Sequence, residues 1–137
     1  MSVPILSCEN LQYCEGDICL LNEVSFRLDS GQRAVVLAEP HRCATILLKI
    51  CATLIPPTSG RISWFGRSSE EMDSHDIYNL RRRIAIVHRE TSLISNMTIL
   101  DNISLGLQYH DEISLEEAYD RVTELLKQFE LYEYRLL

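Results

Sequence analysis

The sequence contains no long hydrophobic run. No uninterrupted apolar stretch approaches the ~18 residues that a membrane-spanning helix needs. The first ten residues carry neither a basic segment nor the apolar stretch of a secretory signal peptide. These absences argue against membrane insertion and against export, and we expect the chain in the cytoplasm.

Basic residues are also scarce relative to acidic ones. The 13 lysines and arginines stand against 20 aspartates and glutamates, which gives a formal charge of −7. A sequence-independent hold on nucleic acid depends on a basic surface. We therefore expect no nucleic-acid partner. We interpret the one basic run, residues 81–83, as cations that complement the C-terminal end of a short helix.

Cysteine pairs with metal-binding spacing are absent as well. The five cysteines, at positions 8, 14, 19, 43 and 51, form no Cys-x-x-Cys pair. An odd number of cysteines in a chain without an export signal fits reduced, mostly buried thiols. The sequence therefore predicts free thiols and no cysteine-bound metal.

Apolar residues are plentiful enough for one folded domain. They make up 46% of the 137 residues, which suffices for a core of ordinary size. The central feature is residues 34–50, which contain a short apolar run, a turn around Pro40 and the start of an apolar-periodic helix that runs from about Thr45 to Leu54. This order of strand, loop and helix is the setting of a phosphate-binding loop.

The loop itself departs from the phosphate-binding signature, which is Gly-x4-Gly-Lys-[Ser/Thr]. Ala38 and Cys43 occupy the places of the two glycines, and Ala44 occupies the place of the lysine. Thr45 is the only match. The sequence keeps the setting of the loop and loses most of its chemistry.

The segments around this loop resemble the ATP-binding subunit of ABC transporters. Val-Val-Leu-Ala at 35–38 precedes the loop, Leu-Leu-Lys-Ile at 47–50 follows it, and Pro-Pro-Thr-Ser-Gly-Arg-Ile comes next at 56–62. Asn-Met-Thr-Ile-Leu-Asp-Asn-Ile at 96–103 resembles the start of the family's helical subdomain. The resemblance covers nearly the whole chain, which corresponds to about the N-terminal half of a typical subunit.

The resemblance implies an α/β fold, a partial P-loop NTPase-like domain of the ABC ATPase type. We divide it into an antiparallel β unit (1–32), half of the P-loop core (33–97) and the start of the α-helical subdomain (98–137). Alternation and short apolar runs predict strands at 5–11, 18–21, 24–28, 33–37, 61–65 and 84–87. Periodicity and capping residues predict helices at 45–54 and 75–82, from 98, and at 115–130.

Two of these helices have capping signals at their start. Thr98 and Asp101 can form a reciprocal N-terminal cap, and Ser-Leu-Glu-Glu at 114–117 is a capping box. The helix at 115–130 also carries an apolar stripe that we interpret as a core face: Leu115, Ala118, Val122, Leu125, Leu126 and Phe129.

The resemblance also implies a nucleotide site. Tyr13 stands where the family has an aromatic residue that stacks on adenine, although a half-buried sheet tyrosine is an equal alternative. Arg89 takes the place of the family's glutamine, which touches magnesium and the attacking water. The residues of the loop complete the predicted site: Ala38, Glu39, Pro40, His41, Arg42, Cys43, Ala44, Thr45 and Ile46.

These substitutions remove most of what ATP requires. Phosphate loops aim backbone N–H groups through glycines with positive φ and neutralise phosphate oxygens with a lysine, and an arginine at 89 cannot ligate a cation. Arg42 can still bring a positive charge toward a phosphate, and Thr45 can still ligate Mg²⁺. We expect ATP and Mg²⁺ to bind weakly or not at all, and no hydrolysis by this chain alone. His41, His88 and Glu39 have no relay partner at motif spacing, so we interpret them as ordinary loop residues.

Full-length members of the family continue beyond the position of Leu137 with the signature loop, the Walker B residues and the switch histidine. In the family fold, strands from this C-terminal segment separate the strand at 33–37 from the strand at 84–87. Without that segment, the two predicted strands would face a gap in the sheet. Uncovered strand edges are costly. A missing C-terminal half, a second chain or a self-paired homodimer would cover the edge, and we favour a fragment of a longer protein.

The sequence thus supports two functions. The first is a degenerate ATP-binding subunit that couples ATP binding to transport through a transmembrane partner, at the inner face of the membrane. The alternative is a non-catalytic pseudo-ATPase that acts as a structural or regulatory partner. The loss of the family's motif residues at 38, 43, 44 and 89 favours this alternative. The pattern at 56–60 and 88–103 disfavours an unrelated P-loop kinase or GTPase.

Overall fold

The computed structural model describes residues 3–87, 93–111 and 113–137. The chain divides into two compact units, Met1–Ile86 and Val87–Leu137. The proposed subdomain boundaries at 32/33 and 97/98 stay predictions.

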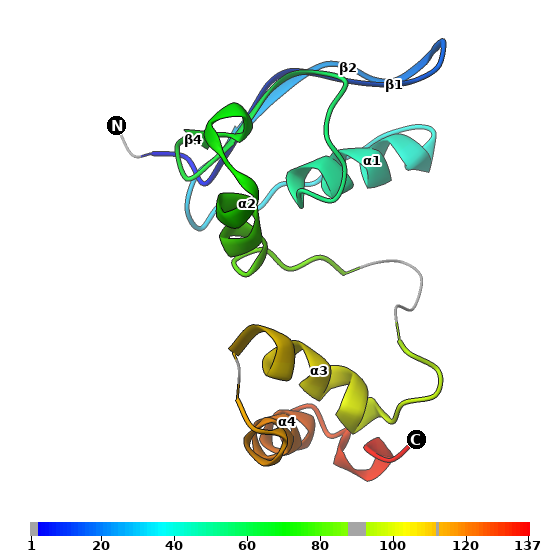
Figure 1. The fold of residues 1–137 in the computed structure, drawn as a ribbon. Helices are drawn as coiled ribbons and strands as arrows, with labels where there is room; N and C mark the ends of the chain where they lie inside the picture. The colour runs from blue at the N-terminus through cyan, green and yellow to red at the C-terminus, as the bar shows by residue number, and fades with distance from the viewer. Residues whose placement is uncertain (1–2, 88–92, 112) are drawn as a thin grey trace. The chain divides into compact units, whose positions relative to one another are not determined.

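The first unit is built on a four-stranded antiparallel sheet with the strand order β2-β1-β3-β4 (Figure 1). The predicted antiparallel β unit is therefore confirmed, although the runs at 18–21 and 24–28 belong to one long strand. Bulges in the pairing of β1 with β2 let the hairpin twist. The strands are β1 (Leu6–Glu15), β2 (Ile18–Leu28), β3 (Ser59–Trp64) and β4 (Arg67–Ser68).

The turn between β1 and β2 carries a disulfide between Cys14 and Cys19. The prediction that all the cysteines are reduced is wrong for this pair. The turn at Gly16 and Asp17 reverses the chain so tightly that the two cysteines become direct register partners across the hairpin. Within the described residues, Cys8, Cys43 and Cys51 are free thiols.

Two helices pack onto the hydrophobic core of the sheet (Figure 1). α1 (His41–Cys51) buries Ile50, and α2 (Ser74–Arg81) buries Leu80, in the same cluster as Leu11 and Ile62. The predicted helix at 75–82 is confirmed as α2. A short 3-10 helix, η1 (Ser69–Glu71), precedes it.

α1 begins at His41, four residues before the predicted start, and it ends at Cys51. Pro40 is its N-cap and has the extended conformation that leads into a first helical turn. The residues that follow Pro40 all carry a Cβ, and such residues favour right-handed helical backbone over the positive φ that a glycine adopts. The helix therefore extends backward into the predicted loop.

Residues 33–37 and 84–87 do not form strands, so these two predictions are wrong. A strand requires a hydrogen-bonding neighbour, and neither segment belongs to the sheet of β1 to β4. The side chains of residues 33–37 lie mostly in solvent: Val35 is 86% exposed and Leu37 is 92% exposed. In the second segment, Ile84 is half-buried against the hydrophobic core.

The second unit contains α3 (Ile99–Asp111), α4 (Leu115–Gln128) and the 3-10 helix η2 (Tyr132–Tyr134). The predicted reciprocal cap of α3 is confirmed, since Asp101 N–H donates to Thr98 Oγ1 at 3.1 Å and Thr98 N–H donates to Asp101 Oδ2 at 3.2 Å. None of the helices described here combines the length and the hydrophobicity that crossing a membrane requires.

α4 confirms the predicted helix at 115–130 in type and start. Ser114 Oγ accepts the predicted bond from Glu117 N–H at 3.2 Å. The predicted core stripe is only partly buried: Leu115 and Phe129 are exposed. The positions that do form the core face are Ala118, Val122 and Leu126.

Candidate functional site

The predicted phosphate loop lies at the N-terminal end of α1, after residues 33–37. Ala38 is half-buried, Glu39 and Pro40 are exposed, and Cys43 and Ala44 are half-buried in the first turns of the helix. Thr45 is exposed and Ile46 is buried in the core. The structure thus keeps these residues together at one helix end, while Arg89 and the side chain of His41 lie outside the described part of the chain.

The backbone of this segment does not form a phosphate cradle. Cradles of this kind aim successive N–H groups at the anion through residues with positive φ. No residue from 38 to 46 has a positive φ, and Cys43 N–H donates to the carbonyl of Pro40 at 2.9 Å. That amide is committed to the helix turn and not directed toward a ligand.

The one cation of the loop is engaged by an acid. The Arg42 guanidinium forms an ion pair with the carboxylate of Glu15, at the end of β1. Both side chains are substantially exposed, so the pair is a weak surface interaction worth about 0–1 kcal/mol. A phosphate would compete with Glu15 for Arg42. No pattern in the sequence indicates this pair, because only the fold brings residues 15 and 42 together.

Tyr13 lies on β1, two residues before Glu15, and its register partner on β2 is Leu21. It is half-buried and packs against the hydrophobic cluster of the sheet. This position is compatible with the alternative of a sheet tyrosine. Its role as an adenine platform stays a prediction.

The residues present do not fit a magnesium-bound triphosphate. The lysine is replaced by Ala44, the backbone lacks the cradle, and Arg42 is paired with Glu15. Thr45 retains a hydroxyl that can ligate Mg²⁺. Among the residues that the structure describes, no group of three or more His, Cys, Asp or Glu side chains could hold a metal ion.

A pair of thiols, Cys8 of β1 and Cys51 of α1, lies in the core at the other end of α1 from the predicted loop. The pKa of the Cys8 thiol is raised because it donates a hydrogen bond to Cys51 and because it is buried. The pKa of the Cys51 thiol is lowered because it accepts that bond. Cys51 is the less buried of the two, so it is the more reactive thiol.

Comparison with known proteins places the chain in one family. A family sequence model described as ABC transporter matches residues 21–136. The chain is 30% identical over 131 residues to the methionine import ATP-binding protein MetN of Chlamydia pneumoniae, which covers 94% of this chain and 38% of that relative. It is 32% identical over 107 residues to the sulfate/thiosulfate import ATP-binding protein CysA of Escherichia coli K12, which covers 78% of this chain and 27% of that relative. The chain spans about a third of the length of these curated relatives.

Solved structures show the same fold. The ATP-binding cassette MJ0796, in a dimeric post-hydrolysis state bound to ADP and Pi, matches with a TM-score of 0.80 at 24% identity, over 96% of this chain and 60% of that one. CbiO1 from Clostridium perfringens, part of the transporter complex cbiONQ, matches with a TM-score of 0.75 at 22% identity, over 98% of this chain and 54% of that one. The predicted fold class, a partial α/β domain of the P-loop NTPase type, is confirmed.

Proposed function

The chain belongs to the ABC transporter family, and on that premise we propose that it is part of an ATP-binding subunit that couples nucleotide binding to transport through a transmembrane partner. The observation that carries this proposal is the continuous family match from β2 to the last helices, residues 21–136. The relatives are import ATP-binding proteins for methionine and for sulfate or thiosulfate. This favours the uptake of a small solute, with the subunit held at the inner face of the membrane by its partner.

Nucleotide binding by this portion is weak in our proposal, and hydrolysis is absent. An anion gains some stabilisation from the N-terminal end of α1, but the segment offers neither the lysine nor the amide cradle. A fluorescent ATP analogue, titrated with and without Mg²⁺, measures the affinity directly. Saturation in the low micromolar range supports a working nucleotide site. No binding at millimolar concentration refutes a working site and favours a non-catalytic partner.

Restoring the loop tests whether its setting is intact. The triple variant Ala38→Gly, Cys43→Gly and Ala44→Lys returns positive φ to the backbone and an ammonium to the helix end. We expect it to bind the analogue at least about tenfold more tightly than the parent, since one charge-assisted hydrogen bond corresponds to about 1.5–3 kcal/mol. The matched control replaces Ala44→Lys with Ala44→Met, which supplies length without charge. Equal affinities of the two triple variants would contradict a phosphate-binding setting.

The second candidate is a non-catalytic partner within an ABC assembly. The ion pair between Arg42 and Glu15 favours it, because it neutralises the one cation of the loop with a residue of the chain itself. If the chain is a non-catalytic partner, Glu15→Gln leaves nucleotide binding undetectable. If it is part of an ATP-binding subunit, Glu15→Gln releases Arg42 and tightens the binding of the ATP analogue.

Residues 33–37 are the proposed contact for the remainder of the cassette. Val35 and Leu37 are almost fully exposed, and apolar surface of this kind is stabilised by about 25 cal/mol per Å² when it is covered. Strands of a C-terminal half, of a second chain or of a second copy would cover it. Analytical ultracentrifugation of the chain and of the Leu37→Lys variant tests the homodimer: a dimer that persists in the variant argues against pairing through this segment.

A further inference from the structure

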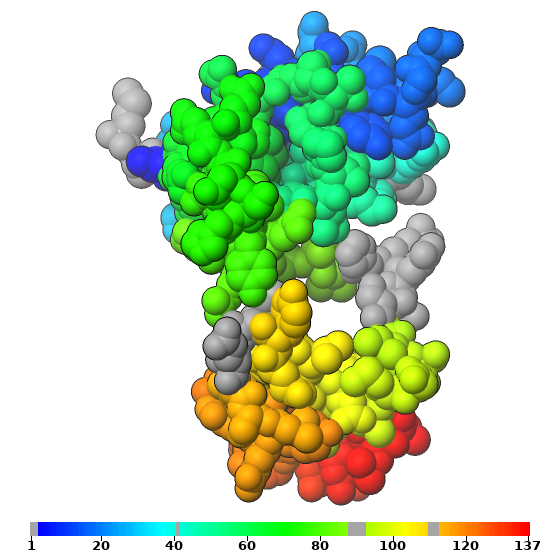
Figure 2. Space-filling view, viewed as in Figure 1, coloured from blue at the N-terminus to red at the C-terminus, as the bar shows by residue number. Residues whose placement is uncertain are grey.

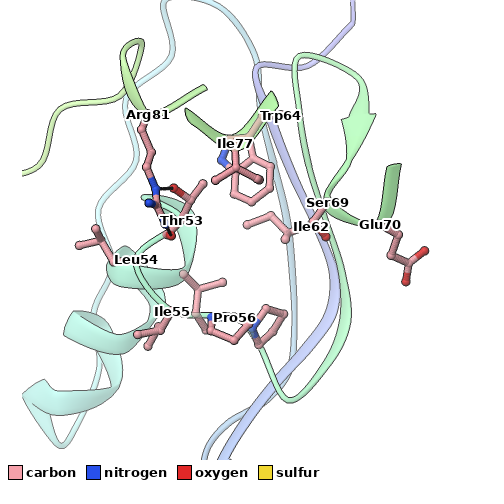
Figure 3. A pocket seen from close by; sticks show the side chains of 12 residues that line it. Thr53, Leu54, Ile55, Pro56, Ile62, Trp64, Ser69, Glu70, Ile77 and Arg81 are labelled. Atoms are coloured by element: carbon pink, nitrogen blue, oxygen red, sulfur yellow. Dashed lines mark hydrogen bonds between the residues drawn. The ribbon is translucent and has the colours of Figure 1, made fainter. Parts of the chain in front are cut away.

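The first unit contains a pocket of about 430 Å³ between the C-terminal end of α1, β3 and α2 (Figure 3). Its volume falls in the range of small-molecule sites, which are mostly apolar with a few placed polar groups. Two buried side chains of β3, Ile62 and Trp64, form its floor, and Leu54 and Ile77 contribute to its walls. This pocket lies at the opposite end of α1 from the loop that precedes it.

The indole of Trp64 is held in one orientation. Its Nε1–H donates to the carbonyl of Cys51 at 2.9 Å, so the polar edge of the ring is satisfied by the end of α1. The pocket therefore has a rigid apolar floor.

The mouth of the pocket is formed around a strained residue. Thr53 follows the C-cap of α1 and has a φ of +61°, a conformation that is unfavourable for a β-branched side chain. Its N–H donates to Ile50 and the N–H of Leu54 donates to Lys49, the pattern of a helix end at which glycine is the usual residue. Strain of this kind persists only where the surroundings fix it, and it concentrates at ligand sites.

Arg81 of α2 is what fixes Thr53. Its Nε donates to Thr53 Oγ1 at 2.9 Å and its Nη2 donates to Thr53 O at 2.7 Å, as Figure 3 shows. A guanidinium has a further N–H pair beyond these two atoms, and here its plane is already oriented. Glu70 also lines the pocket. Its Oε2 lies 3.8 Å from Nη2 of Arg61, so the negative charge of Glu70 is partly balanced. The pocket thus joins an apolar floor to an oriented cation.

We propose that this pocket binds a medium-chain carboxylate, with its hydrocarbon chain against Ile62 and Trp64 and its carboxylate on the guanidinium of Arg81. Carboxylate is the anion that matches a planar guanidinium. Because Thr53 already orients the guanidinium, little ordering of the side chain is required on binding. The site is independent of the nucleotide and of transport.

Trp64 is the only tryptophan of the chain, so its fluorescence reports on binding at β3. Trp64 also lines two smaller pockets, whereas Arg81 and Ile77 line only this one of the three, so variants at these two positions assign the signal to this pocket. We would titrate the full chain with octanoate and with 1-octanol, each below the concentration at which it aggregates. The two probes have the same chain length, and only octanoate has a charge. We expect a saturable change in Trp64 emission for octanoate, with an affinity about tenfold higher than for 1-octanol.

Two variants locate the charge. Arg81→Gln should bring the affinity for octanoate down to that for 1-octanol, whereas Arg82→Gln, which makes the same change at the next position outside the pocket, should keep the tenfold difference. Ile77→Phe narrows the pocket and should weaken both probes.

Equal affinities of the parent chain for octanoate and 1-octanol would overturn the proposal, since Arg81 would then contribute nothing to binding. The pocket would in that case be a purely apolar site, suited to a protein side chain. An unaltered preference for octanoate in Arg81→Gln would overturn it as well. The comparison of probes on the parent chain requires no variant to fold.

Discussion

Replacing Gly60 by alanine tests whether the contact between β1 and β3 fixes the sheet. Gly60 has a φ of +89°, and a Cβ built on it would lie 2.3 Å from Asn10 O and 2.7 Å from Leu11 Cα. Both are backbone atoms of β1, so the clash is relieved only when one strand moves. The left-handed backbone costs an alanine about 1–2 kcal/mol, and forced displacement in a packed region adds about 1–3 kcal/mol. We expect Gly60→Ala to lower the free energy of unfolding by about 2–5 kcal/mol.

Gly31→Ala is the matched control. Gly31 has a similar φ of +77°, but nothing lies within 4 Å of its Cβ position. It should lose only the backbone contribution, about 1–2 kcal/mol. Urea unfolding followed by the fluorescence of Trp64, which lies on β3, measures both variants. With a slope of about 1–3 kcal/mol per M, the midpoint of Gly60→Ala should fall clearly further than that of Gly31→Ala. Equal shifts would refute the steric argument, because only the clash distinguishes the two positions.

Three further predictions concern other parts of the chain. Iodoacetamide should modify Cys51 before Cys8, because the pKa of the Cys51 thiol is lowered and that of Cys8 is raised. Mass spectrometry of peptides would show the order. Faster modification of Cys8 would contradict the assignment of Cys8 as the hydrogen-bond donor and Cys51 as the acceptor. The pKa of Asp101 in the folded chain is lowered, first by the hydrogen bond from Thr98 and then by that from Tyr119. The ionised carboxylate therefore stabilises the fold above the unfolded-state pKa of about 3.9. This stabilisation is lost as the pH falls through the lower pKa of the folded state. Thermal unfolding of Asp101→Asn, followed by circular dichroism, should therefore show a weaker loss of stability in acid than the parent, and an unchanged acid profile would exclude this carboxylate as the cause. Magnesium-dependent ATPase activity should not exceed background, and turnover that disappears in Thr45→Ala would contradict this.

Local patterns in the sequence predicted the elements whose causes are local. The reciprocal cap of Thr98 and Asp101 and the cap at Ser114 depend on residues three apart, so the starts of α3 and α4 could be read directly. The hairpin of β1 and β2 could be predicted from alternation and turn residues. Its disulfide could not, because an odd number of cysteines without an export signal indicates reduced thiols, whereas the bond between Cys14 and Cys19 depends on the register across the hairpin.

Residues 33–37 show why other predictions failed. Their apolar run predicts a buried strand, and in the described structure it has no neighbouring strand and stays in solvent. A pattern of hydrophobicity reports the environment that a segment requires, whereas a strand forms only when its partner is present. The start of α1 failed for a different reason. Cys43 and Ala44 remove the chemistry of the loop, and they also favour helical backbone at positions where a glycine would allow a positive φ.

The location of backbone strain connects the two ends of α1. A phosphate loop needs positive φ before the helix, and this chain has none from residue 38 to 46; after the helix, where glycine is the usual residue, Thr53 has a φ of +61°. A strained threonine costs about 1–3 kcal/mol, and two hydrogen bonds from Arg81 hold it in place. If the strain served only to end the helix, Thr53→Gly would stabilise the chain and leave octanoate binding unchanged. We expect instead that Thr53→Gly weakens octanoate binding, since it removes the hydroxyl that orients Arg81, while the free energy of unfolding changes little or rises.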